Sequence, residues 1–171
     1  MFAPWSNYFT LTGASGATLL GLLFVVVTLG GDLSKSRKLD IARASMTPAL
    51  YSFTSVLVQS MIVMVPWISG WHGGLLFVVI GIGGGIYRIH AVRVRRTLHL
   101  RAIQGPVDWI FHNAAPVAAS GLLTAGGVAW IRESAFTPFF VALSSATFLV
   151  SGIYRSWGET LALIGLPDKE S

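Results

Sequence analysis

The sequence contains no cysteine, and this absence removes several kinds of chemistry at once. Disulfide bonds, thiolate nucleophiles, thiolate-bound zinc, iron–sulfur clusters and the CxxCH attachment of haem are all excluded. Charge is also scarce: Asp, Glu, Lys and Arg make up 11% of the chain, against about 25% in soluble domains. Because 53% of the 171 residues are hydrophobic, the chain has too little polar surface to cover a soluble domain. We therefore expect an all-α polytopic membrane protein.

The motifs of common catalytic sites are missing as well. The chain has no GxSxG, no HExxH and no paired-carboxylate arrangement, and the GIGGG run at 81–85 lacks the Lys-Ser/Thr of a phosphate-binding loop. We predict that the protein is not an enzyme and has no dedicated cofactor or metal site. His90 and His112 should lie at similar depth in the membrane, which leaves haem or metal binding as a third-ranked hypothesis.

What the chain does have is a series of long apolar stretches. Each is uncharged over most of its length, and we predict that they form five transmembrane helices: residues 8–29, 48–67, 74–87, 106–131 and 138–157. No positively charged region precedes the first, so it is expected to be a retained span and not a cleaved signal. The stretch 74–87 is short and rich in glycine, and a four-span variant would arise if it did not cross.

Three of these predicted helices share the same start signal. Thr47-Pro48, Gly105-Pro106 and Thr137-Pro138 each place a residue suited to the N-cap before a proline. Proline is favoured at the first helical position, where its missing N–H is not needed. We therefore predict that helices begin at these three prolines.

The distribution of basic residues predicts the orientation. Alternating five spans puts segments 31–46, 88–105 and 158–171 on one side, and with the boundary residue Arg155 they hold eleven of the twelve Lys and Arg residues. Only Arg132 falls on the other side. Because positive loops stay in the cytoplasm, the N-terminus is predicted outside and the C-terminus inside.

The segment from Arg88 to Arg101, RIHAVRVRRTLHLR, is the most basic part of the chain. Taken alone it resembles a nucleic-acid patch, but it joins two spans at the predicted cytoplasmic side, so we expect a helical extension followed by a connection and no nucleic-acid partner. Its arginines are predicted to contact anionic lipid headgroups, at about 1 kcal/mol each. They are Arg88, Arg93, Arg95, Arg96 and Arg101.

The first predicted span, with its GASGATLLGLLFVVV run, resembles the opening helix of a broad group of uncharacterised small bacterial membrane proteins. The resemblance covers about thirty residues. It implies a multi-span helical fold in the bacterial inner membrane, and it brings no assigned activity or functional residues.

Small residues recur at intervals of four along the predicted helices. Gly13, Ala17 and Gly21 share one face of the first span, and Gly81 and Gly85 share a face of the third. Such faces allow helices to approach closely in lipid. They predict either a compact monomer or subunit contacts in a homo-oligomer.

The second span carries a polar stripe formed by Ser52, Ser55 and Gln59, which lie on one helical side. A glutamine near the bilayer centre needs a partner. The stripe therefore predicts either hydrogen bonds between helices or the lining of a water-filled pore.

The start of the fourth span, PVDWIFHNAAP, is the most polar part of any span. Asp108 and His112 are four residues apart and share a face, with Asn113 adjacent. Pro116 cannot donate to the carbonyl group of His112, so that carbonyl is free to bind water, a side chain or an ion. This predicts a polar site at the inner mouth of a pore, or a structural role in which Asp108 caps the helix and pairs with Arg101 or another upstream arginine.

Three hypotheses about function follow. The first is a homo-oligomeric membrane protein that forms a pore or conducts an ion or solute. The alternative is a non-conducting accessory or scaffold protein that binds another membrane protein or anionic lipid through its basic segments. The third is the haem- or metal-binding membrane protein that the two histidines suggest.

Overall fold

The computed structural model describes residues 2–32, 37–97 and 106–164, and every regular element within these ranges is helical. The all-α prediction is therefore confirmed. In chain order the first elements are the 3₁₀ turn η1 (Ala3–Trp5), α1 (Ser6–Asp32), α2 (Arg37–Met64) and α3 (Gly70–Thr97). The second half consists of α4 (Pro106–Trp109), the π-helical turn η2 (Ile110–Ala114), α5 (Ala115–Ile131) and α6 (Thr137–Ile164).

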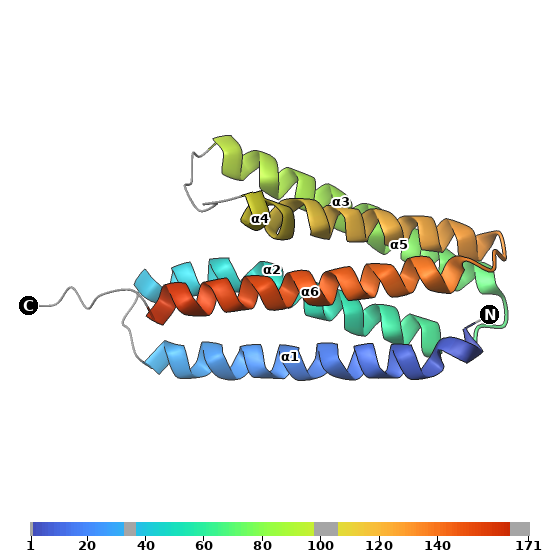
Figure 1. Ribbon diagram of the computed structural model, residues 1–171, viewed down its shortest axis with the longest axis horizontal. Coiled ribbons are helices and arrows are strands. Elements are labelled where there is room, and N and C mark those ends of the chain that lie inside the picture. The colour runs from blue at the N-terminus through green and yellow to red at the C-terminus, as the bar shows by residue number, and fades with distance from the viewer. Residues whose placement is uncertain (1, 33–36, 98–105, 165–171) are drawn as a thin grey trace, which may run out of the picture.

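The long helices lie side by side along one axis (Figure 1). Helix α1 packs against α2, α2 against α6, α6 against α5, and α5 against α3. Helices α2 and α3 make little contact, although they are consecutive in the chain. We call the end of the bundle where α1 ends, α2 begins and α3 ends the basic end (Figure 1). The turns from α2 to α3 and from α5 to α6 lie at the opposite end.

Four stretches within the described helices are long and apolar enough to cross a membrane: Ala3–Val26, Gly70–His90, Val107–Ile131 and Thr137–Trp157. The remaining predicted span lies in α2, where the apolar part, Pro48–Met64, has only 17 residues. At 1.5 Å per residue it is about 25 Å long, slightly less than the roughly 30 Å of a hydrocarbon core. The short span is thus in α2 and not in the glycine-rich α3, which runs for 28 residues.

The predicted helix starts are correct at two of the three prolines. Helix α4 begins at Pro106, and α6 begins at Thr137, next to Pro138. The prediction at Pro48 is wrong, because α2 begins at Arg37 and Pro48 lies inside it. Proline costs one backbone hydrogen bond there, but the remaining turns of a 28-residue helix continue across the gap. Helix α3 also extends into the basic segment as far as Thr97, as predicted, and the remainder of that segment lies outside the described residues.

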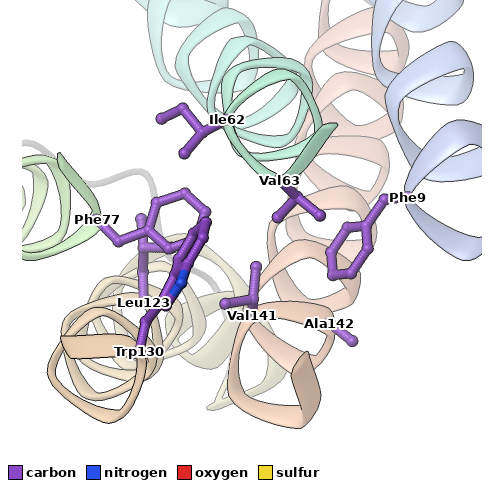
Figure 2. Close-up of a cluster of buried hydrophobic side chains, with 8 residues drawn as sticks. All are labelled: Phe9, Ile62, Val63, Phe77, Leu123, Trp130, Val141 and Ala142. Atoms are coloured by element: carbon purple, nitrogen blue, oxygen red, sulfur yellow. The ribbon is translucent and has the colours of Figure 1, made fainter. Parts of the chain in front are cut away.

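A hydrophobic core joins five helices near the end opposite the basic end. Figure 2 shows Trp130 beside Phe77 and Leu123, with Val63, Val141 and Phe9 across from them. Phe9, Phe77 and Val141 are fully buried. The complete cluster is Phe9, Ile62, Val63, Phe77, Leu123, Trp130, Val141 and Ala142.

Glycines bring α3 and α5 unusually close together. A Cβ atom at Gly74 would lie 2.8 Å from the carbonyl oxygen of Gly127, and one at Gly127 would lie 2.6 Å from that of Gly74. A Cβ at Gly81 would likewise lie 2.8 Å from the backbone nitrogen of Thr124. Gly81 thus lies at this close contact, whereas the atom nearest to a Cβ at Gly85 is at an ordinary 3.8 Å.

The predicted packing face of α1 is only partly correct. Gly13 contacts Ser60 of α2, but Ala17 is exposed and Gly21 has no neighbouring atom within 4 Å of its Cβ position. The contact instead continues through Gly16, whose Cβ position lies 3.1 Å from the carbonyl oxygen of Phe53. An α-helix turns 100° per residue, so i, i+3 neighbours are as close as i, i+4 neighbours.

Candidate functional site

The interior of the bundle is polar in one half, while its outer surface is apolar. Leu11, Met61 and Leu143 are 67%, 60% and 56% exposed, as expected for side chains that face lipid. Buried polar side chains gather on the inner faces of α2 and α6. On α2 they are Ser52, Ser55, Gln59 and Ser60, and on α6 they are Ser144, Ser145, Ser151 and Arg155, besides Thr137 at its first position.

Gln59 connects these two polar faces. Its side chain is fully buried, and its Oε1 accepts a 2.8 Å hydrogen bond from the hydroxyl group of Ser145. Its Nε2 has no hydrogen-bond partner in the part of the chain that the structure describes. The side-chain oxygen of Gln59 therefore has a partner on another helix, as one of the two interpretations predicted, whereas its amide N–H groups have none among the described residues.

Ser52 and Ser55 lie on the same buried face as Gln59, as the spacing predicted. Their hydroxyl groups donate to carbonyl oxygens one turn earlier, to Pro48 at 3.1 Å and to Tyr51 at 2.7 Å. A pore on an oligomer axis would need these side chains on the outer surface. Since they are buried within the bundle, any path that they line must run inside the protomer.

Arg88 is the main correction to the sequence predictions for this region. Its side chain is only 8% exposed, and its guanidinium carbon lies 4.6 Å from the ring centroid of Tyr51 and 5.0 Å from that of Phe148. Arg88 thus points into the bundle and not toward lipid headgroups, because α2 and α6 each offer it an aromatic face. The side chains of Arg93, Arg95 and Arg96, and all of Arg101, lie outside the described residues.

The polar residues at the start of the fourth predicted span meet a partner on α6. The hydroxyl group of Tyr154 donates a 2.5 Å hydrogen bond to Oδ1 of Asp108. His112 Nδ1 lies 3.0 Å from the backbone carbonyl oxygen of Asp108, and the imidazole packs edge-on against the ring of Tyr154. Asn113 is half-buried in the same turn. The predicted pairing of Asp108 with Arg101 lies outside the described residues.

The helix is irregular at the position where Pro116 predicted a disturbance. Residues Ile110–Ala114 form a π-helical turn, and the N–H group of Ala115 donates to the carbonyl oxygen of Ile110, five residues earlier. Such turns often mark functional sites in helical proteins. This turn brings Phe111 onto the ring of Tyr154, with centroids 4.6 Å apart.

The sequence predictions missed Tyr51, Tyr154 and Arg155. Arg155 is 5% exposed and contributes a second positive charge near Arg88. Its signal was present in the sequence, because it is the only charged residue in the predicted span 138–157. The two tyrosines gave no such signal, since tyrosine is common near helix ends in membranes.

The described residues contain no group of three or more His, Asp or Glu side chains that could hold a metal ion. The haem hypothesis relied on His90 and His112. The side chain of His90 is exposed, whereas that of His112 packs against the ring of Tyr154.

Four membrane-length apolar helices, an apolar outer surface and a partly polar interior indicate a helical integral membrane protein. Comparisons with protein-family models, with curated proteins and with solved structures find no match to this chain.

Proposed function

We propose that the protein conducts or carries an ion or small polar solute through the interior of the protomer. One observation carries the proposal: α2 and α6 both bury polar side chains inside the bundle and are joined there by the hydrogen bond between Ser145 and Gln59, while apolar side chains cover its outside. A bundle that served only as a membrane anchor would gain more from an apolar interior, because buried polar groups are costly when they lack partners.

The polar interior extends from the middle of the bundle to the basic end. From Ser145 to Arg155 the polar face of α6 covers about 15 Å at 1.5 Å per residue, which is half of a hydrocarbon core of roughly 30 Å. Helix α2 runs antiparallel to α6 (Figure 1), so Gln59 lies beside Ser145 and Ser52 lies closer to the basic end. A solute would enter the path from that end.

The other half of the bundle is closed by the hydrophobic core. Phe9, Phe77, Trp130 and Val141 fill the interior beyond Gln59. Passage across the membrane therefore requires these side chains to move. This arrangement favours a carrier that opens to one side at a time over a permanently open channel.

The experiment that tests the proposal is reconstitution in lipid vesicles. Swelling of the vesicles is followed by light scattering in three iso-osmotic media. Potassium gluconate with valinomycin, which carries K⁺, reports entry of the anion; potassium thiocyanate, whose anion crosses lipid unaided, reports entry of the cation; and glycerol reports entry of an uncharged solute. We expect entry of at least one of these solutes above that of protein-free vesicles, reduced several-fold by Gln59→Leu. The matched control is Thr54→Leu, which makes a polar-to-leucine change on an exposed position of the same helix.

The proposal is wrong if no solute enters faster than in protein-free vesicles. It is also wrong if Gln59→Leu and Thr54→Leu, both folded, conduct equally well, because Gln59 would then not lie on the path.

A second candidate function, a non-conducting accessory protein, is supported by the outer face of α1. Ala17 and Gly21 leave an open strip of small residues at the edge of the bundle, where another transmembrane helix could approach closely. A second copy of this chain would fit the same strip. Native mass spectrometry of the purified protein distinguishes a single chain, a homo-oligomer and a complex with a different subunit.

A further inference from the structure

We propose that Arg88 binds an oxyanion, a carboxylate or a phosphate group, inside the basic half of the bundle. The inference deepens the proposed function, on which its role in transport rests, by naming the chemical class of the solute. The binding itself is measured without transport.

Two aromatic rings lie against the Arg88 guanidinium group. Tyr51 from α2 lies 4.6 Å away and Phe148 from α6 lies 5.0 Å away, so cation–π contacts hold the plane of the group. Gly84 makes room for this arrangement one turn earlier in α3, because a Cβ atom there would collide with the hydroxyl group of Tyr51. The ring of Tyr87 stacks on that of Tyr51, with centroids 6.1 Å apart.

One edge of the guanidinium group has no hydrogen-bond partner among the described residues. Nε and Nη2 of Arg88 are buried and have no hydrogen-bond partner among the residues that the structure describes. These two nitrogens are neighbours in the group, and together they form the edge that donates two parallel hydrogen bonds to a carboxylate or phosphate. Arg88 thus presents two adjacent unpaired donors, which is the protein's side of a two-hydrogen-bond contact with an oxyanion.

The surrounding charge favours an anion over a water molecule. Arg155 adds a second positive charge near Arg88 and is itself 5% exposed. Among the acidic side chains that the structure describes, Asp108 receives the hydroxyl hydrogen bond of Tyr154. Water could accept the two hydrogen bonds of Arg88, but it could not balance the charge, which is costly to bury unpaired.

Gln59, deeper in the bundle, also has a buried donor without a partner among the described residues. Its unpartnered Nε2 is also a donor, so the buried unpaired side-chain atoms of both Gln59 and Arg88 require an acceptor. A solute that carries acceptor oxygens is the class of molecule that satisfies both groups.

The test measures thermal unfolding of the full-length protein in uncharged detergent. Sodium acetate or sodium phosphate is added and compared with sodium chloride at equal ionic strength. We expect a saturable rise in Tm of roughly 5 °C with acetate or phosphate, and no saturable rise with chloride. Arg88→Lys keeps the charge but loses the paired donors, so the rise should disappear. The control Arg132→Lys makes the same change at an exposed arginine at the opposite end and should keep the rise.

A lipid headgroup carries the same phosphate chemistry as the free anion. Native mass spectrometry after addition of phosphatidylglycerol separates the two sources, because a retained lipid that Arg88→Lys loses identifies the headgroup as the occupant. If Arg88→Lys does not fold, Arg88→Met replaces it, since an apolar side chain of similar length removes the buried charge. With Arg88→Met the rise in Tm should again be absent.

The proposal is overturned if acetate, phosphate and phosphatidylglycerol all leave the wild-type protein unchanged, or if a folded Arg88 variant responds as the wild type does. Binding without solute entry into vesicles would contradict the proposed function alone. Entry of a solute without anion binding would contradict the Arg88 site alone.

Discussion

Tyr154 on α6 donates a hydrogen bond of 2.5 Å to the carboxylate of Asp108 in the first turn of α4. The two residues are 46 positions apart. Their hydrogen bond joins α4, which directly precedes the π-helical turn η2, to the part of α6 near the basic end. The ring of Tyr154 also stacks on Phe111 of that turn. One side chain therefore holds the irregular segment in place through both a polar and an aromatic contact.

Removing this hydroxyl group should loosen the segment without removing the ring. Tyr154→Phe keeps the stacking on Phe111 but removes the hydrogen bond that the Asp108 carboxylate accepts, so we expect Tm to fall by roughly 2–4 °C. Tyr87→Phe is the matched control, because Tyr87 is 56% exposed and retains its ring contact with Tyr51. Equal Tm values for the two variants would show that the Tyr154 hydrogen bond contributes nothing.

Close packing of α3 on α5 should make glycine replacement at the contact unfavourable. In Gly127→Ala the new methyl group would lie 2.6 Å from the carbonyl oxygen of Gly74, so the helices must separate, at a cost of about 1–3 kcal/mol. Gly121→Ala on the same helix has no atom within 4 Å and should be neutral or stabilising by up to about 1 kcal/mol. Denaturant unfolding in detergent measures both, and a loss of stability in both variants would refute the role of this contact.

The turn between α5 and α6 contains a residue in a strained backbone conformation. Glu133 has φ = 54°, with its N–H donating to the carbonyl of Trp130 and the next N–H, from Ser134, donating to Ala129. This pair of bonds is the Schellman motif, which favours glycine at the position of Glu133.

Glu133→Gly should accordingly stabilise the protein by about 1 kcal/mol, because glycine adopts positive φ without a clash at Cβ. Glu133→Ala removes the same charge but keeps the Cβ atom, so it should give no gain. Thermal unfolding of the two variants distinguishes them: a similar increase in both would mean that the charge, and not the backbone, limits stability.

Much of the fold could be predicted from composition and periodicity. The apolar stretches, the helix start at Pro106 and the extension of α3 to Thr97 follow from local chemistry, since a helix in lipid must satisfy its own backbone. The error at Pro48 has the same origin: proline at a helix start and proline inside a long helix look alike in a short window, and only the length of α2 separates them.

The candidate site was predicted less completely. Ser52, Ser55 and Gln59 were placed on one face of α2 because periodicity determines which residues share a face. Whether that face points to lipid, to an oligomer axis or into the protomer depends on the other helices, and here α6 covers it through the bond from Ser145 to Gln59.

By itself, the sequence determined that this is a helical chain suited to a membrane, with its basic residues gathered in a few segments. Only the tertiary structure decided that Arg88 lies inside the bundle between Tyr51 and Phe148, and that Tyr154 holds Asp108. The physical reason is that helix formation depends on neighbours within four residues, whereas the direction of a long side chain such as arginine depends on which aromatic and charged groups distant helices bring near it.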